Sequence, residues 1–206
     1  MMMLRVGRQR KTSAGFGHQP IDALSRLEKI NSATSSARGN SRAPQMDGIA
    51  EALGMLDDAV TVLEHVRTDL RLLAEPVIAA SAEPDSVTRA LFADEYDERR
   101  DALARHVVGP QDAAAVLLNQ DGQEYGVPVD DALTYRIGRF PMALGPEGLG
   151  LPAPAGGFSE MSEVIAVLKA IEGALDKIDR VFTRYSQDKT FLERKLAFLK
   201  DSVVSS

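Results

Sequence analysis

The chain has 206 residues, of which 44% are hydrophobic and 26% charged, a balance typical of soluble globular domains. Its longest unbroken apolar stretches run only a few residues, far short of the roughly 20 that a membrane-spanning helix needs, which excludes membrane insertion. The absence of cysteine excludes a disulfide scaffold, a thiol nucleophile and a thiolate metal site. Because aromatic residues make up only 5%, the core must be aliphatic, which favours helix packing.

The net charge of −6 is unevenly distributed, since residues 1 to 20 carry +4 and the rest of the chain carries −10. We expect residues 1 to 20 to form a basic, disordered arm. Four positive charges without interleaved aromatic residues, ahead of an acidic body, argue against a nucleic-acid partner. The four apolar residues at the N-terminus are too few for the core of a secretory signal.

Residues 21 to 46 are predicted to form a short helix and a loop. Residues 31 to 45 are rich in Ser, Asn, Gly and Ala, so we place the loop there and the start of a long helix at Asp47. We expect Pro76 to kink or end this helix because proline lacks a backbone donor. Coiled-coil spacing with one slip is seen at Ile49, Leu53, Leu56, Val60, Leu63, Val66, Leu70 and Leu73.

A second helix is predicted to begin at Asp85 or Ser86 and to end near Gly109. Its apolar side carries Phe92, Tyr96, Leu103 and Val107. Between about residues 115 and 140 apolar residues alternate, which predicts a β-hairpin, and the turn signal lies at residues 120 to 122. Residues 145 to 157 hold five Gly and three Pro and must form a loop.

The last predicted helix follows Ser159, a favourable N-cap with Glu163 in the first turn. Two apolar rows repeat every seven residues, and only Lys189 interrupts them. Six heptads predict a helix of roughly 60 Å that pairs lengthwise with another helix. The rows are Val164, Ile171, Ile178, Tyr185, Leu192 and Leu199, and Leu168, Leu175, Phe182, Lys189, Leu196 and Val203.

The predicted fold class is mainly α: an elongated antiparallel helical bundle or coiled-coil rod, over residues 47 to 206, with a small β-hairpin. The helix from Asp47 is expected to pack antiparallel on the helix after Ser159. Since the first helix is predicted to be the shorter, the C-terminal end of the second should lack a partner, and this apolar end includes Phe198. The predicted partner interface there comprises Phe191, Leu192, Leu196, Leu199 and Val203.

Motifs that carry chemistry are missing from the sequence. His18, His65 and His106 lie far apart and in no metal-binding spacing. The acidic run from Asp94 to Glu98 is followed by Arg99 and Arg100, so a salt-bridged solvent face is the default interpretation. We therefore predict no enzyme activity, no cofactor, no metal and no small-molecule substrate.

The order of these elements resembles the rod domain of bacterial flagellins, especially the short flagellins of alphaproteobacteria. Residues 24 to 33, LSRLEKINSA, look like the flagellin "LSRLS-G-(K/R)INSA" stretch with one residue missing. The resemblance spans roughly residues 24 to 200 in order. Further similar segments are Val66 to Leu70, Glu95 to Leu103, Val116 to Asn119, Ala132 to Ile137, Leu149 to Leu151, Leu168 to Phe182 and Ser186 to Leu199.

The chain also departs from the flagellin pattern. The family's "DDAAG" after Ala33 is replaced by residues 34 to 39, TSSARG, and the terminal helices that form the filament's inner tube have no counterpart among these residues. The resemblance implies a structural or assembly protein of the bacterial flagellum, which is exported without a cleaved signal peptide and contacts flagellar subunits or itself. The alternative is a cytoplasmic coiled-coil adaptor or regulator that binds a flagellar partner.

Overall fold

The computed structural model describes residues 23–107, 113–119, 121 and 123–204, with side chains from Arg42 to Ser202. The chain divides into two units, residues 1–38 and 39–206. The first unit is described as helical backbone from Ala23 onward, and the predicted arm of residues 1 to 20 lies outside the described residues. In the second unit, mainly helical structure is combined with one two-stranded antiparallel sheet, as the predicted mainly α class requires.

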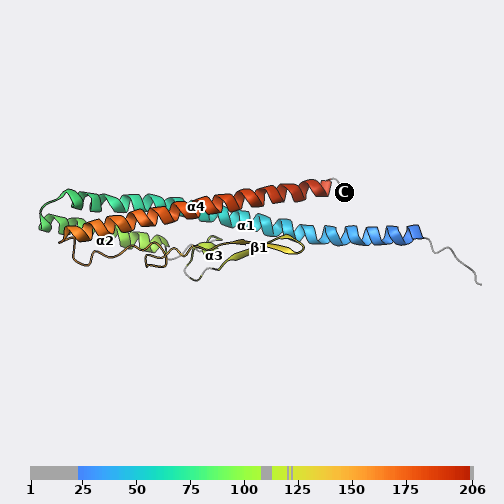
Figure 1. Cartoon of the computed structure of the whole chain (residues 1–206), viewed down its shortest axis with the longest axis horizontal. Coiled ribbons are helices and arrows are strands. Elements are labelled where there is room, and N and C mark those ends of the chain that lie inside the picture. The colour runs from blue at the N-terminus through green and yellow to red at the C-terminus, as the bar shows by residue number, and fades with distance from the viewer. Residues whose placement is uncertain (1–22, 108–112, 120, 122, 205–206) are drawn as a thin grey trace, which may run out of the picture. The chain divides into compact units, whose positions relative to one another are not determined.

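Helix α1 runs without interruption from Ala23 to Ala82 (Figure 1). The loop predicted for residues 31 to 45 and the helix start predicted at Asp47 are therefore wrong. Ala and Arg favour helix and Ser and Asn cost only a fraction of a kcal/mol each, so composition alone is a weak argument for a loop. The predicted apolar face is confirmed, because Ile49, Leu56, Leu63 and Leu70 are fully buried.

The break predicted at Pro76 is also wrong, since α1 continues for six residues beyond it. Proline removes the hydrogen bond to the carbonyl four residues earlier, which belongs to Leu72. Arg99, from the next helix, donates a hydrogen bond to that carbonyl. Leu73 and Val77, on either side of Pro76, are buried and continue the core face of the helix. Tertiary contacts therefore offset the missing backbone donor.

Helix α2 spans Ser86–Val107, as predicted, and Asp85 caps it by accepting from the backbone N–H of Thr88 at 2.9 Å. Tyr96, Leu103 and Val107 are buried, which confirms the predicted apolar side. Contacts to α1 pair Arg99 with Glu75 at 2.9 Å and His106 with Asp69 at 3.1 Å. The residue numbers rise on one helix while they fall on the other, so α2 is antiparallel to α1.

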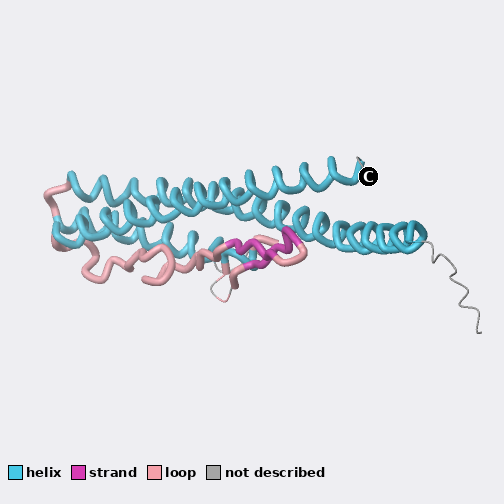
Figure 2. The backbone as a smooth tube through the Cα atoms, turned by 45° about the vertical axis from the view of Figure 1, so that its right-hand side comes forward, coloured by secondary structure: helices cyan, strands magenta, loops and turns pink. Residues whose placement is uncertain are grey.

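Helix α4 spans Met161–Val204 and lies antiparallel along α1, as predicted (Figures 1 and 2). The pairing is fixed by Arg67 with Asp179 at 3.4 Å and by Lys189 with Asp57 at 2.5 Å. Ser159, the predicted N-cap, lies two residues before the helix. Glu163 instead closes the helix start, since its carboxylate accepts from the backbone N–H groups of Gly156 and Phe158 at 2.7 and 3.0 Å.

One of the two predicted apolar rows of α4 is the buried row. All six of its members, from Val164 to Leu199, are at most 5% exposed. The other row was placed one residue too far along: Val167, Ala174, Val181 and Asp188 are buried, while the predicted Leu168, Leu175 and Leu196 are half-buried. At three successive heptads both neighbouring positions are apolar, so spacing alone could not choose between them: Val167 and Leu168, Ala174 and Leu175, and Val181 and Phe182.

The β-hairpin is confirmed within the predicted range. Strand β1, Tyr125–Asp130, pairs antiparallel with β2, Leu133–Ile137, so that Val127 lies opposite Tyr135. The chain reverses at residues 131 and 132, between the two alternating segments, and Asp121 of the predicted turn signal lies in a turn that precedes β1. The strands are preceded by a short helix that was not predicted, α3, Ala115–Leu118, and the predicted loop of residues 145 to 157 contains no helix or strand.

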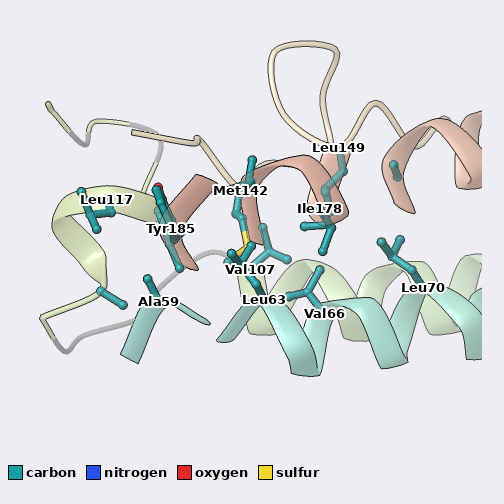
Figure 3. Packing of buried hydrophobic residues seen from close by; sticks show 14 of the residues in the cluster. Ala59, Leu63, Val66, Leu70, Val107, Leu117, Met142, Leu149, Ile178 and Tyr185 are labelled. Atoms are coloured by element: carbon teal, nitrogen blue, oxygen red, sulfur yellow. The ribbon is translucent and has the colours of Figure 1, made fainter. Parts of the chain in front are cut away.

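The core of the second unit runs between the helices and extends under α3 and the loop (Figure 3). Figure 3 shows Tyr185 of α4 beside Leu117 of α3 and Ala59 of α1. Lys177 of α4 holds the loop in place by donating to the carbonyl of Gly148 at 2.7 Å, and Arg184 donates to the carbonyl of Gly138, directly after β2, at 2.9 Å. The loop thus serves as a fourth side of the helical core.

Candidate functional site

The hairpin and the C-terminal half of α4 meet at an aromatic contact. The rings of Tyr135 and Phe191 stack with centroids 4.5 Å apart and an interplanar angle of 27°. The hydroxyl of Tyr135 donates to Asp188 at 2.6 Å, one turn before Phe191. Phe191 is nevertheless 41% exposed. The hairpin therefore fixes this ring in position while leaving part of it open to solvent.

Two turns further along α4, Phe198 is 64% exposed. Lys195 connects this ring to the hairpin, because its ammonium lies 5.6 Å from the Phe198 ring centre and 3.8 Å from the carboxylate of Asp130. The face of α4 on the N-terminal side of these rings forms a shallow groove of about 500 Å³. The lining includes Thr183, Ser186, Gln187, Thr190, Phe191 and Arg194. This surface offers aromatic faces and hydroxyl groups with little charge.

Leu192 and Leu199, two of the five predicted interface residues, are not at the surface, with exposures of 0% and 5%. The predicted apolar overhang is therefore wrong for these positions. It rested on a first helix that begins at Asp47, whereas α1 begins at Ala23 and contacts the end of α4, where Arg42 donates to the carbonyl of Ser202 at 3.3 Å.

The other predicted interface residues differ in their positions. Phe191 is exposed beside the hairpin, Leu196 is half-buried against the core, and the side chain of Val203 lies outside the described residues. Phe198 is more exposed than Phe191 and Leu196, and it lies seven residues after Phe191 on the same face of α4. The seven-residue spacing of Phe191 and Phe198 indicates a third apolar row in the sequence. This row is hard to distinguish from the two predicted rows, because nearly every position from 191 to 198 is apolar or basic.

Asp188 is the main polar group that sequence reasoning missed. It is 8% exposed, and its second carboxylate oxygen makes no hydrogen bond with the described residues. Burial, and secondarily the bond to Asp188, raises the pKa of Tyr135 to about 12. The hydroxyl therefore remains a donor at neutral pH, and the pair acts as a polar anchor between β2 and α4.

Groups that could carry chemistry are few in the part of the chain that the structure describes. No three His, Asp or Glu side chains there come together as a metal site. In the acidic run of α2, Arg99 pairs with Glu95 at 2.6 Å and Arg100 with Asp97 at 3.3 Å, which confirms the predicted salt-bridged face for those residues.

Among the described helices, none combines the length and the apolar character that crossing a membrane would require. No protein-family model matches the chain, and no curated protein matches its sequence.

Proposed function

We propose that this chain is a flagellin-like structural or assembly protein of the bacterial flagellum, which acts through helix-mediated contacts with other flagellar subunits or with copies of itself. The proposal assigns the chain no catalytic residue and no cofactor. The contact surface on α4 is the exposed aromatic pair Phe191 and Phe198, in place of the wider set predicted from the sequence.

The observation that carries the proposal is the sequence order of the packed elements. A long helix, a second antiparallel helix, a hairpin, an irregular loop and a final long helix follow one another. The last helix returns along the first, with Lys189 bonded to Asp57 across 132 residues of chain. This is the order in which segments resembling flagellin occur in the sequence. The exposed rings on α4 give such a protein an apolar contact surface.

The proposal is tested by finding where the protein accumulates in its native cells. Filaments are sheared from the cells and collected by sedimentation, and an antibody against the chain is used on the filament, supernatant and cell fractions. We expect the protein in the filament or supernatant fraction, and absence from both in a strain whose flagellar export apparatus is deleted. Retention in the cell fraction of both strains would favour a cytoplasmic adaptor instead.

A further inference from the structure

Two helix faces that point away from the core carry residues at intervals of four, three and four. This is the a/d spacing of a helix that packs lengthwise on another helix. All eight residues are exposed. We name these faces the α2 stripe and the α4 stripe. The α2 stripe comprises Val87, Leu91, Asp94 and Glu98, and the α4 stripe comprises Gln187, Phe191, Arg194 and Phe198.

The large apolar members of the stripes are well exposed. Val87 and Leu91 are 74% and 67% exposed, against 41% and 64% for Phe191 and Phe198. The core-facing sides of both helices are already occupied, by Tyr96 and Leu103 on α2 and by the buried row on α4. Each stripe therefore holds two large apolar side chains outside the core, and of these four only Phe191 is partly covered, by its stack with Tyr135. Such faces are typical of protein contact sites.

The charges of the two stripes are opposite. Within the described part of the chain, neither Asp94 nor Glu98 forms an ion pair, and the same is true of Arg194. When the stripes are aligned in parallel, Leu91 meets Phe191 and Asp94 meets Arg194. Glu98 then meets Phe198, beside Lys195. The opposite charges of Asp94 and Arg194, the one matched charged pair, favour this pairing and its register.

We infer that the α2 stripe of one copy of this chain docks in parallel on the α4 stripe of a second copy. The inference rests on the proposed function, because it specifies the self-association that the function allows. The occupant of each stripe is a second copy because the complementary face, with the same spacing and the opposite charge, is present on the chain itself.

The geometry of the second unit fixes how such copies are related. Both α2 and α4 are antiparallel to α1, so they run in the same direction. The α1 contacts of Arg99 and Asp179 place Leu91 level with the start of α4, near residue 162. Phe191 lies 29 residues further along, which is about 44 Å at 1.5 Å per residue. Parallel docking therefore shifts each copy by about 44 Å without reversing it.

A contact between two different faces that shifts each copy in one direction does not close on itself. Each copy keeps one free stripe, and a further copy can dock there. We therefore expect open-ended association, in which the mean size grows with protein concentration. A closed dimer, by contrast, would reach a constant mass.

The test uses charge reversal on each stripe of the full chain. In Arg194→Glu the α4 stripe carries a glutamate that faces Asp94, and in Asp94→Arg the α2 stripe carries an arginine that faces Arg194. Each variant alone should associate at least about tenfold more weakly than the natural chain by sedimentation velocity. When the two variants are mixed, association should return, because every contact is then between opposite charges. Arg180→Glu, on an exposed part of α4 outside the stripe, is the matched control.

Helicity by circular dichroism should be unchanged in all variants, since the altered residues are exposed. A natural chain that stays monomeric at high concentration would overturn the inference. So would self-association that survives both reversals, or single variants that do not recover on mixing. These results would leave the filament-fraction experiment as a separate test of the proposed function, because contact with other flagellar subunits does not require the two stripes to pair.

Discussion

Arg99 of α2 donates a hydrogen bond to the backbone carbonyl of Leu72, the carbonyl that Pro76 leaves without its helical donor. A side chain 27 positions away in the sequence thus completes the backbone of α1. The same guanidinium pairs with Glu75 at 2.9 Å and Glu95 at 2.6 Å, so it ties both helices together.

Arg99→Met should lower the free energy of unfolding by about 1 kcal/mol, because the carbonyl of Leu72 then loses its protein donor. In a Pro76→Ala background the loss should be smaller, since the alanine supplies the missing N–H. Urea denaturation of the four proteins in this cycle measures the coupling. Glu75→Gln serves as the control that weakens the ion pair and keeps the carbonyl bond. Equal losses in both backgrounds would show that Arg99 acts through its ion pairs alone.

Arg89 holds the corner where α1, α2 and the loop before α4 meet. Its guanidinium donates to the carbonyls of Glu83, Pro84, Phe158 and Ser159 at 2.6 to 3.0 Å. Arg89→Lys should lower the free energy of unfolding by roughly 2–4 kcal/mol, because one ammonium cannot reach four carbonyls at once. Arg105→Lys, on an exposed part of α2, is the control and should leave the urea midpoint unchanged. A change at Arg89 no larger than that at Arg105 would contradict this role.

The anchor between Tyr135 and Asp188 predicts an asymmetric response to mutation. Tyr135→Phe removes the only donor to a buried carboxylate among the described residues, and should cost about 1–3 kcal/mol of stability. In Asp188→Asn the amide oxygen still accepts from Tyr135 and the buried charge is gone, so stability should be retained or raised. Thermal and urea denaturation of both variants are the measurements. A larger loss for Asp188→Asn than for Tyr135→Phe would show that Asp188 is needed as a charge.

The stability of the protein should decline at alkaline pH. Burial raises the pKa of Tyr96, Tyr135 and Tyr185 to about 12, from about 10 for an exposed tyrosine. The folded chain keeps these protons where the unfolded chain releases them. The stabilisation is therefore complete below about pH 10 and is lost as the pH rises toward 12. Tyrosinate absorption during alkaline titration should follow unfolding, and Tyr96→Phe should flatten the decline in stability. Ionisation of all tyrosines near pH 10 without unfolding would refute the prediction.

The predicted apolar end of α4 contains both core and surface residues: Leu192 is buried in the core, and Phe198 is exposed. Leu192→Asn places an amide in the α1–α4 core and should lower the free energy of unfolding by roughly 3 kcal/mol or more. Phe198→Asn changes an exposed ring, so stability should shift by less than about 0.5 kcal/mol. Self-association measured by sedimentation should weaken in Phe198→Asn. Unaltered association in that variant would remove Phe198 from the contact surface.

Periodicity correctly predicted burial for residues of α1 and α4 that face each other in the core. The spacing alone predicts Ile49, Leu63, Ile171 and Ile178 to lie in buried rows, and all four are buried. The α1–α4 pairing followed, because each of the two long helices carries an apolar row that needs a partner helix. The hairpin was also predictable, since alternation in Tyr125 to Ile137 is a local signal.

What could not be predicted depended on distant residues. The continuity of α1 at Pro76 requires Arg99, and the coverage of Leu199 requires the extended start of α1. Asp188 occupies a buried row position because Tyr135 bonds it from another element, which no helical pattern indicates. The C-terminal part of α4 does carry exposed aromatic rings, Phe191 and Phe198, but the boundary between core and surface differs from the predicted one.

The antiparallel α1–α4 pair also determines the order of events at the ribosome. Asp57 is translated 132 residues before its partner Lys189. At about 5–20 residues per second, the core face of α1 waits roughly 7–26 s before α4 emerges to cover it. Only α2 and the segment after it can shield that face in the meantime. Newly synthesised chains should therefore depend on a chaperone that binds apolar helices, and should aggregate first when translation is slowed between α2 and α4.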